Sequence, residues 1–222
     1  MSKYFIALLM CAVPTYAQAT AQEQSSRMVD ETRVTYLFGS VLPKEAVWQP
    51  LTAEQRRKIY WKSSWANPGV VFRSLGTAAL DQADNDPAEW QQGFAGYSRR
   101  FGSRFASYAL QDAIQAGSAA ALGYEVRYLR CRCEGFGNRF AYAAMQNFVT
   151  KNREGKWRAN LPQWFGSLGG SAIAVYGWYP ESTRNGNEIL RNAAFQLAVP
   201  IVFNAIVEFG PEIKTAFLFW RR

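Results

Sequence analysis

Small residues recur at helical spacing along much of the chain, most regularly between Pro87 and Leu122. They follow one another at steps of three or four, which places them on one face of a helix. The residues of this stripe are Ala95, Ser98, Gly102, Ala106, Ala109, Ala113, Gly117 and Ala120. A face this smooth lets other backbones approach closely, so this stretch is expected to be the central helix of a packed bundle.

Local signals at the ends of the periodic stretches predict where helices begin and end. Thr52 with Gln55 three residues later is a capping-box pattern. Asp86 and Pro87 are the expected N-cap and first residue of the central helix, and Gly123 is its expected C-terminal cap. Further helices are expected over residues 50–65, 68–82, 135–150, 159–180, 187–209 and 212–222. The pattern therefore predicts an all-α fold, a single compact bundle of about five to seven helices.

The N-terminal residues have the features of a secretory signal peptide. Lys3 precedes a short apolar run over residues 4–13, and Ala17-Gln18-Ala19 has the form of a cleavage site. The run is too short to span a bilayer, so cleavage near Ala19 is favoured over an uncleaved anchor. We expect a signal peptide over 1–19, a flexible leader over 20–49 and one helical domain over 50–222. Residues 34–41 alternate as a short strand would, with no partner strand evident nearby.

Composition and charge narrow the function without assigning it. The chain has no histidine, which excludes His-dependent nucleophilic catalysis and removes the commonest zinc ligand. Its net charge is +8, and 18 of its 25 basic residues are arginine, which suits contact with carboxylate and phosphate groups. Anionic lipid or an acidic envelope polymer is favoured as partner over nucleic acid, although a solvated basic surface explains the charge more simply. The candidate contacts for an anionic ligand are Arg99, Arg100, Arg104 and Arg139.

Cys131 and Cys133 are a candidate redox pair. The flanking Arg130 and Arg132 would favour a reactive thiolate, and a disulfide across one residue would suit redox exchange. Two incidental cysteines in a connector are the simpler reading, since no helix start or cofactor motif surrounds them. Two thiolates without histidine make a poor metal site, so neither a metal nor another cofactor is expected.

Three carboxylates stand on otherwise apolar helices: Asp112, Glu188 and Glu208. A pair of them could serve acid/base hydrolysis as catalytic residues. If they are buried for structural reasons they need cationic partners, and the candidates are Arg99, Arg104, Arg139 and Arg191. The structural role is favoured, because spacing alone cannot bring two of these carboxylates together.

The small-residue stripe of the central helix has two counterparts. Gly137, Ala141 and Ala144 form one, and Gly166, Gly170, Ala174 and Gly177 form the other. Such stripes pack helices in membranes and in water alike. The uncharged stretches 159–180 and 192–207, with Trp and Tyr near their ends, favour a membrane. The Pro, Asn and Gln within them and a mean hydropathy of −0.22 oppose it.

Several short segments resemble those of an uncharacterised family of exported bacterial proteins. They are Glu89-Trp90-Gln91-Gln92-Gly93, Gly96-Tyr97-Ser98-Arg99-Arg100-Phe101-Gly102, Arg127-Tyr128, Phe148-Val149-Thr150-Lys151-Asn152, Trp178-Tyr179-Pro180 and Glu208-Phe209-Gly210-Pro211-Glu212-Ile213. The resemblance implies one helical domain behind a signal peptide, and it implies no activity. The chain departs from the family at Glu125-Val126, where relatives tend to have Asp-Pro, and at Gly210, where they tend to have tryptophan.

These patterns favour a non-enzymatic helical protein, exported to the periplasm or cell envelope, with a binding or scaffolding role at a membrane surface. The first alternative is a small integral membrane protein packed through its small-residue faces. The second is an enzyme that uses the three carboxylates. A continuous apolar belt would favour the membrane protein, and a pocket lined by those carboxylates would favour the enzyme.

Overall fold

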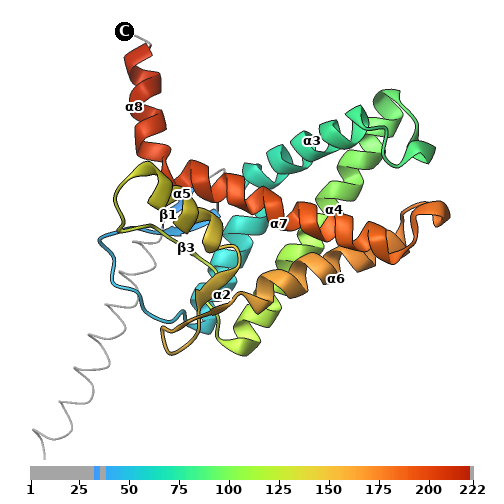
Figure 1. Cartoon of the computed structure of the whole chain (residues 1–222). Helices are drawn as coiled ribbons and strands as arrows, with labels where there is room; N and C mark the ends of the chain where they lie inside the picture. The colour runs from blue at the N-terminus through green and yellow to red at the C-terminus, as the bar shows by residue number, and fades with distance from the viewer. Residues whose placement is uncertain (1–32, 36–38, 221–222) are drawn as a thin grey trace, which may run out of the picture.

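The computed structural model describes residues 33–35 and 39–220. The chain is mainly helical over these residues, which confirms the coarse expectation of a helical protein (Figure 1). The helices are α2 (Ala53–Tyr60), α3 (Pro68–Ala83), α4 (Gly93–Leu122), α5 (Phe136–Met145), α6 (Leu161–Gly177), α7 (Gly186–Glu208) and α8 (Gly210–Trp220). A π-helical turn, Trp61–Trp65, continues α2, and 3-10 turns cover Ala88–Trp90 and Glu181–Thr183. The expected signal peptide lies outside the described residues.

Two small β-sheets accompany the helices. Strands β1 (Arg33–Thr35), β2 (Gly39–Leu42) and β3 (Tyr128–Leu129) form one sheet, and β4 (Val149–Lys151) and β5 (Trp157–Ala159) form the other. β2 pairs antiparallel with β1 and parallel with β3, with Val41 opposite Tyr128. The expectation that the strand near residues 34–41 has no partner is therefore wrong, because β2 pairs with β1 and with the distant β3. Val41, Leu42 and Ala46 are buried, so the packed region begins before residue 50.

Helix ends that depend on local chemistry lie where the sequence predicts them. Thr52 and Gln55 form both hydrogen bonds of the capping box at the start of α2. Gly123 ends α4 in the left-handed conformation, with φ at 74°. The predicted start of α4 at Pro87 is wrong, since the helix begins at Gly93 and the residues before it form a separate 3-10 turn.

The side chain of Arg100 explains the late start of α4. Its guanidinium is buried and donates hydrogen bonds to the carbonyl oxygens of Asp86, Pro87 and Gln91, at 2.8, 2.8 and 2.6 Å. These bonds fold the connection from α3 back over the first turns of α4. The backbone there leaves the helical conformation, since Gln91 has a positive φ of 59°.

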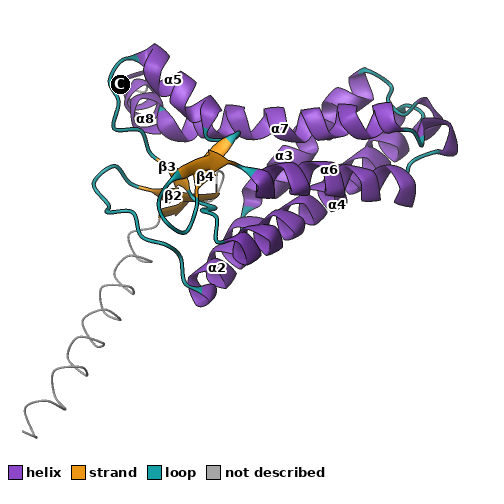
Figure 2. Cartoon of the chain, turned by 60° about the horizontal axis from the view of Figure 1, so that its bottom comes forward, coloured by secondary structure: helices purple, strands orange, loops and turns teal. Residues whose placement is uncertain are grey.

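The four longest helices form two hairpins, α3–α4 and α6–α7 (Figures 1 and 2). α4 packs against both α3 and α6, and α7 packs against α6 and α5. Both hairpins turn at the same end of the molecule, here called the loop end. The other end, here called the base, contains α2, the two sheets, α5 and α8.

The small-residue stripes do not all pack as expected. On α6, Gly166, Gly170 and Ala174 are buried, and a Cβ at Gly166 would lie 2.8 Å from the Gln111 carbonyl oxygen of α4. The stripe of α4 faces outward instead, because the buried face of that helix is the one that contains Arg100, Arg104 and Gln111. The exposed members of that stripe are Ala95, Ser98, Gly102, Ala113, Gly117 and Ala120.

Candidate functional site

The interior formed by α3, α4, α6 and α7 is polar. Apart from glycine, alanine and proline, the buried apolar residues of these helices are three valines and Tyr108. The buried polar residues are Ser74, Thr77, Asp81, Arg100, Ser103, Arg104, Ser107, Gln111, Gln163, Ser167, Ser171, Asn192, Gln196 and Glu208. A helical domain folded in water buries leucine, isoleucine and phenylalanine at such positions, so this interior is inverted with respect to the usual pattern.

Hydrogen bonds between these side chains link the helices. Arg104 on α4 donates to both carboxylate oxygens of Asp81 on α3, each at 2.6 Å, and to the side-chain oxygen of Asn192 on α7 at 2.8 Å. Gln111 donates to Ser167 of α6 at 3.3 Å. The interior is thus held by paired polar groups and by close backbone contact, with little apolar burial.

The outer faces of the same helices are apolar. Large exposed residues cover them: Val71, Phe72 and Leu80 on α3, Phe94 and Leu122 on α4, Leu161, Trp164, Phe165, Leu168, Ile173 and Tyr176 on α6, and Leu190 and Val202 on α7. Only two charged residues of these four helices are exposed, Arg99 and Arg191, and both lie within two turns of the loop end. We call this surface the apolar flank.

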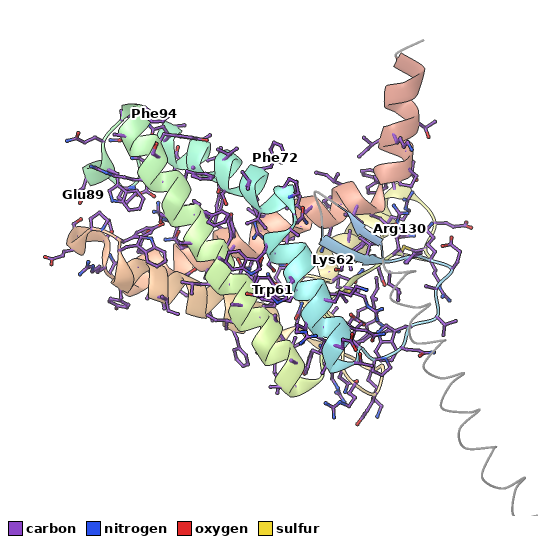
Figure 3. All side chains as sticks on the ribbon, turned by 180° about the vertical axis from the view of Figure 1, so that it is seen from behind. Trp61, Lys62, Phe72, Glu89, Phe94 and Arg130 are labelled. Atoms are coloured by element: carbon purple, nitrogen blue, oxygen red, sulfur yellow. A yellow bond between two sulfur atoms is a disulfide. The ribbon has the colours of Figure 1, made fainter. Side chains whose placement is uncertain are left out.

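Charged side chains gather at the two ends of the flank. The loop end exposes Asp84, Glu89, Glu181 and Arg184. The base has a net positive charge: it exposes the cations Arg57, Lys58, Lys62, Arg132, Arg153, Lys156, Arg158 and Lys214 and the carboxylates Glu45, Glu54, Glu134, Glu154 and Glu212. Figure 3 shows Glu89 and Phe94 near the loop end, with Lys62 and Arg130 toward the base.

One helix of the described chain, α7, is long and apolar enough to cross a membrane. Only 17% of its most apolar window is buried, whereas the core helix of a water-soluble protein would be mostly buried. The apolar character of α7 therefore belongs to the flank and contributes little to the interior.

A cavity of about 680 Å³ lies between α2, α3, α4 and α7. Its apolar wall includes Val70, Ala113, Gly117, Ala120 and Phe203. Among the described residues, its charged lining consists of four arginines, Arg56, Arg57, Arg73 and Arg153, and a single carboxylate, Asp112. The volume is that of a small-molecule site, and the second half of the α4 stripe forms one wall of it.

Asp112 is the one catalytic candidate that lines this cavity. Its carboxylate accepts a hydrogen bond from Arg73 at 3.4 Å, and Arg73 also lies over the ring of Tyr108. Glu188 lies elsewhere and pairs with Arg191 at 2.7 Å. The three candidate carboxylates therefore occupy three separate ion pairs and do not form one site.

Glu208 belongs to a buried cluster at the base. Its carboxylate accepts hydrogen bonds from Arg139 at 3.0 Å, from the hydroxyl of Tyr128 at 2.9 Å and from the backbone amide of Cys131 at 3.1 Å. Burial and the charge of Glu208 raise the pKa of Tyr128 above its usual range. Cys131 and Cys133 form a disulfide beside this cluster. The arrangement fixes the end of α7 against the β3 segment.

The four candidate arginines differ in their contacts. Arg100, Arg104 and Arg139 make the internal contacts described above, and Arg99 is exposed on α4. The pairs Glu188–Arg191 and Glu208–Arg139 join residues that the sequence offered as partners. Sequence reasoning missed Asp81 and Arg73, although they are the only charges on α3, the same signal that singled out Asp112.

Among the described residues, no group of three or more Cys, Asp or Glu side chains could hold a metal ion. Comparisons of the chain with protein-family models, with curated proteins and with solved structures found no match. The flank, the cavity and the two charged ends are the features of the described chain that bear on its function.

Proposed function

We propose that this is an integral membrane protein whose two helical hairpins lie in the lipid bilayer and whose base is a binding module at the membrane surface. The observation that carries the proposal is the inversion of polarity, with Arg104, Asp81 and Gln111 buried and residues such as Phe72 and Leu168 exposed. In lipid, exposed apolar side chains cost nothing, and charged groups face the bundle interior in pairs.

The dimensions of the flank support this proposal. At 1.5 Å per residue, the 16 residues of α3 and the 17 of α6 give about 24 and 25 Å. This is a few ångströms less than a typical hydrocarbon core of about 30 Å, a mismatch that local thinning of the bilayer accommodates.

The aromatic and basic residues at the edges of the flank suit the lipid interface. Trp61 and Trp65 are exposed where α2 meets α3, and Trp164 is exposed near the start of α6. Tyr176 is exposed near the other end of α6. Tryptophan and tyrosine favour the level of the head groups, and the cations of the base suit anionic head groups beside them. Anionic lipid is accordingly the proposed partner.

The proposed location is the bacterial cell envelope, reached through residues 1–19 as a signal peptide. This part of the proposal rests on the sequence pattern and on the resemblance to the family of exported proteins. No enzymatic activity is proposed, since the cavity contains one carboxylate, Asp112, and its neighbour Arg73 already pairs with it.

Carbonate washing of isolated envelopes tests the membrane proposal. An integral protein stays in the pellet at high pH, because its apolar flank remains in lipid. A protein that is held only by the cations at its surface is released. Recovery in the supernatant at the level of a peripheral control protein would overturn the proposal. A mild-detergent extract of the same pellet should then yield the folded protein.

A further inference from the structure

The cavity lies where the flank meets the base, and its lining changes character along its length. Asp112 and Ala120 both line it and are eight residues apart on α4, so it follows this helix for about 12 Å. Ala113, Gly117 and Ala120 are exposed, so this wall is open to the surroundings. Apart from Asp112 and Gln115, the residues that α4 contributes to the cavity are alanine and glycine, and this small apolar surface suits an extended hydrocarbon chain.

The positive charge of the cavity lies mainly at its base side. Asp112 neutralises Arg73, which leaves Arg56, Arg57 and Arg153 without a carboxylate in the cavity. Arg57 and Arg153 are exposed and form no ion pair within the described part of the chain. Arg56 donates to the carbonyl oxygen of Tyr124 at 2.6 Å. Burial lowers the pKa of Arg56, the nearby carboxylate of Glu125 opposes this, and the charges of Arg127 and Arg153 lower it further.

We propose that the cavity binds an anionic single-chain amphiphile, with its alkyl chain along the small-residue face of α4 and its head group at the three arginines. Arginine suits a carboxylate or a phosphate head, and each methylene that leaves water contributes about 0.8 kcal/mol. The second half of the α4 stripe, which forms one wall of the cavity, thereby has a ligand.

Native mass spectrometry of the full-length protein, released from an uncharged maltoside detergent, tests this proposal. Laurate and dodecyl phosphate should both form one-to-one adducts. Dodecanol, which has the chain without the charge, should bind at least about tenfold more weakly, and so should acetate and inorganic phosphate, which have the charge without the chain. Equal binding of dodecanol and laurate, or no binding of laurate, would overturn the proposal.

Two glycines of α4 provide a matched pair of variants. A Cβ added to Gly117 or to Gly102 meets no atom within 4 Å, but only Gly117 lines the cavity. Gly117→Leu should place a branched side chain in the path of the alkyl chain and strongly weaken laurate binding, and Gly102→Leu should leave it unchanged. Laurate binding of Gly117→Leu at the wild-type level would contradict the proposal.

A second pair of variants tests the head-group site on the surface, where folding is not at risk. The double substitution Arg57→Gln with Arg153→Gln should weaken laurate binding by about tenfold, and Arg158→Gln, outside the cavity, should not. An unchanged affinity of the double variant for laurate would show that Arg57 and Arg153 do not bind the head group. Laurate binding is measured in detergent and does not depend on whether the flank lies in lipid. Absence of binding would therefore contradict the ligand proposal alone, whereas release by carbonate would contradict the membrane proposal.

Discussion

Arg104 and Asp81 form a bidentate ion pair inside the molecule, and the pair joins α4 to α3. Nε and Nη2 of Arg104 each lie 2.6 Å from a carboxylate oxygen of Asp81, and Nη1 lies 2.8 Å from the side-chain oxygen of Asn192 on α7. Three helices therefore meet at one guanidinium. Loss of either charge leaves the other buried without compensation, so the pair holds α4 against α3, and the bond to Asn192 connects this hairpin to the α6–α7 hairpin.

The substitution Asp81→Asn should destabilise the fold by about 3–5 kcal/mol, because it leaves the Arg104 guanidinium buried beside a neutral amide. Thermal or denaturant unfolding of the purified protein in a mild detergent measures this. Arg191→Gln is the control, since Arg191 is 54% exposed and its ion pairs should contribute less than about 1 kcal/mol. Similar unfolding midpoints for the two variants would show that the Arg104 pair does not hold the helices.

Much of the secondary structure could be predicted because its signals are local. The capping box at Thr52 and the left-handed Gly123 act on neighbours within one turn, and they end helices in the same way in any surroundings. The start of α4 could not be predicted in this way. It depends on Arg100, whose side chain reaches back to carbonyl groups 9 to 14 residues earlier in the chain.

The face of α4 that packs against the other helices could not be predicted from the local sequence pattern either. Its small stripe and its polar face both have helical spacing, and in water the polar face would be the outer one. The structure buries the polar face, and Asp81, Asn192 and Ser167 from three other helices accept hydrogen bonds from Arg104 and Gln111 on it. Such partners become visible only once the helices are assembled, which is why the sequence singled out Asp112 and the small-residue stripe separately and predicted close helix packing, not a cavity, for the stripe.

Substitutions of two glycines on α6 should have opposite effects. A Cβ at Gly166 would lie 2.8 Å from the Gln111 carbonyl oxygen, so Gly166→Ala must push α6 away from α4 and should cost about 1–3 kcal/mol. A Cβ at Gly177 meets no atom within 4 Å, so Gly177→Ala should stabilise the helix by about 0.4–1 kcal/mol. Unfolding midpoints in detergent distinguish the two. A Gly166 variant as stable as the wild type would mean that α6 and α4 are not in close contact.

Protonation of Glu125 at acid pH should destabilise the base. Burial raises the pKa of this carboxyl, but hydrogen bonds and charge from Arg127 outweigh it and hold the pKa below its usual value. The pair is almost wholly buried, with each side chain 1% exposed. Because the folded pKa is below the unfolded one, the unfolded chain binds more protons at low pH.

The contribution of Glu125 should therefore be complete above its unfolded pKa of about 4.3 and be lost as the pH falls through the lower folded value. Unfolding midpoints measured between pH 7 and pH 3 should show this decline. The variant Glu125→Gln should have a lower midpoint at pH 7 and a shallower decline below pH 5. If the variant declined as steeply as the wild type, Glu125 would not be the group that titrates.

A single lysine on the apolar flank separates a protein embedded in lipid from one that is surrounded by water. Phe72 on α3 is 61% exposed, and in water Phe72→Lys should change stability by no more than about 0.5 kcal/mol. In the hydrocarbon core the same change should cost up to about 3 kcal/mol, less where the lysine reaches the head groups, and lower the amount of protein that resists carbonate washing. Val47→Lys is the control, because Val47 is 70% exposed in the segment before α2, at the base. Equal retention of the two variants in the membrane pellet would show that the flank around Phe72 does not face lipid.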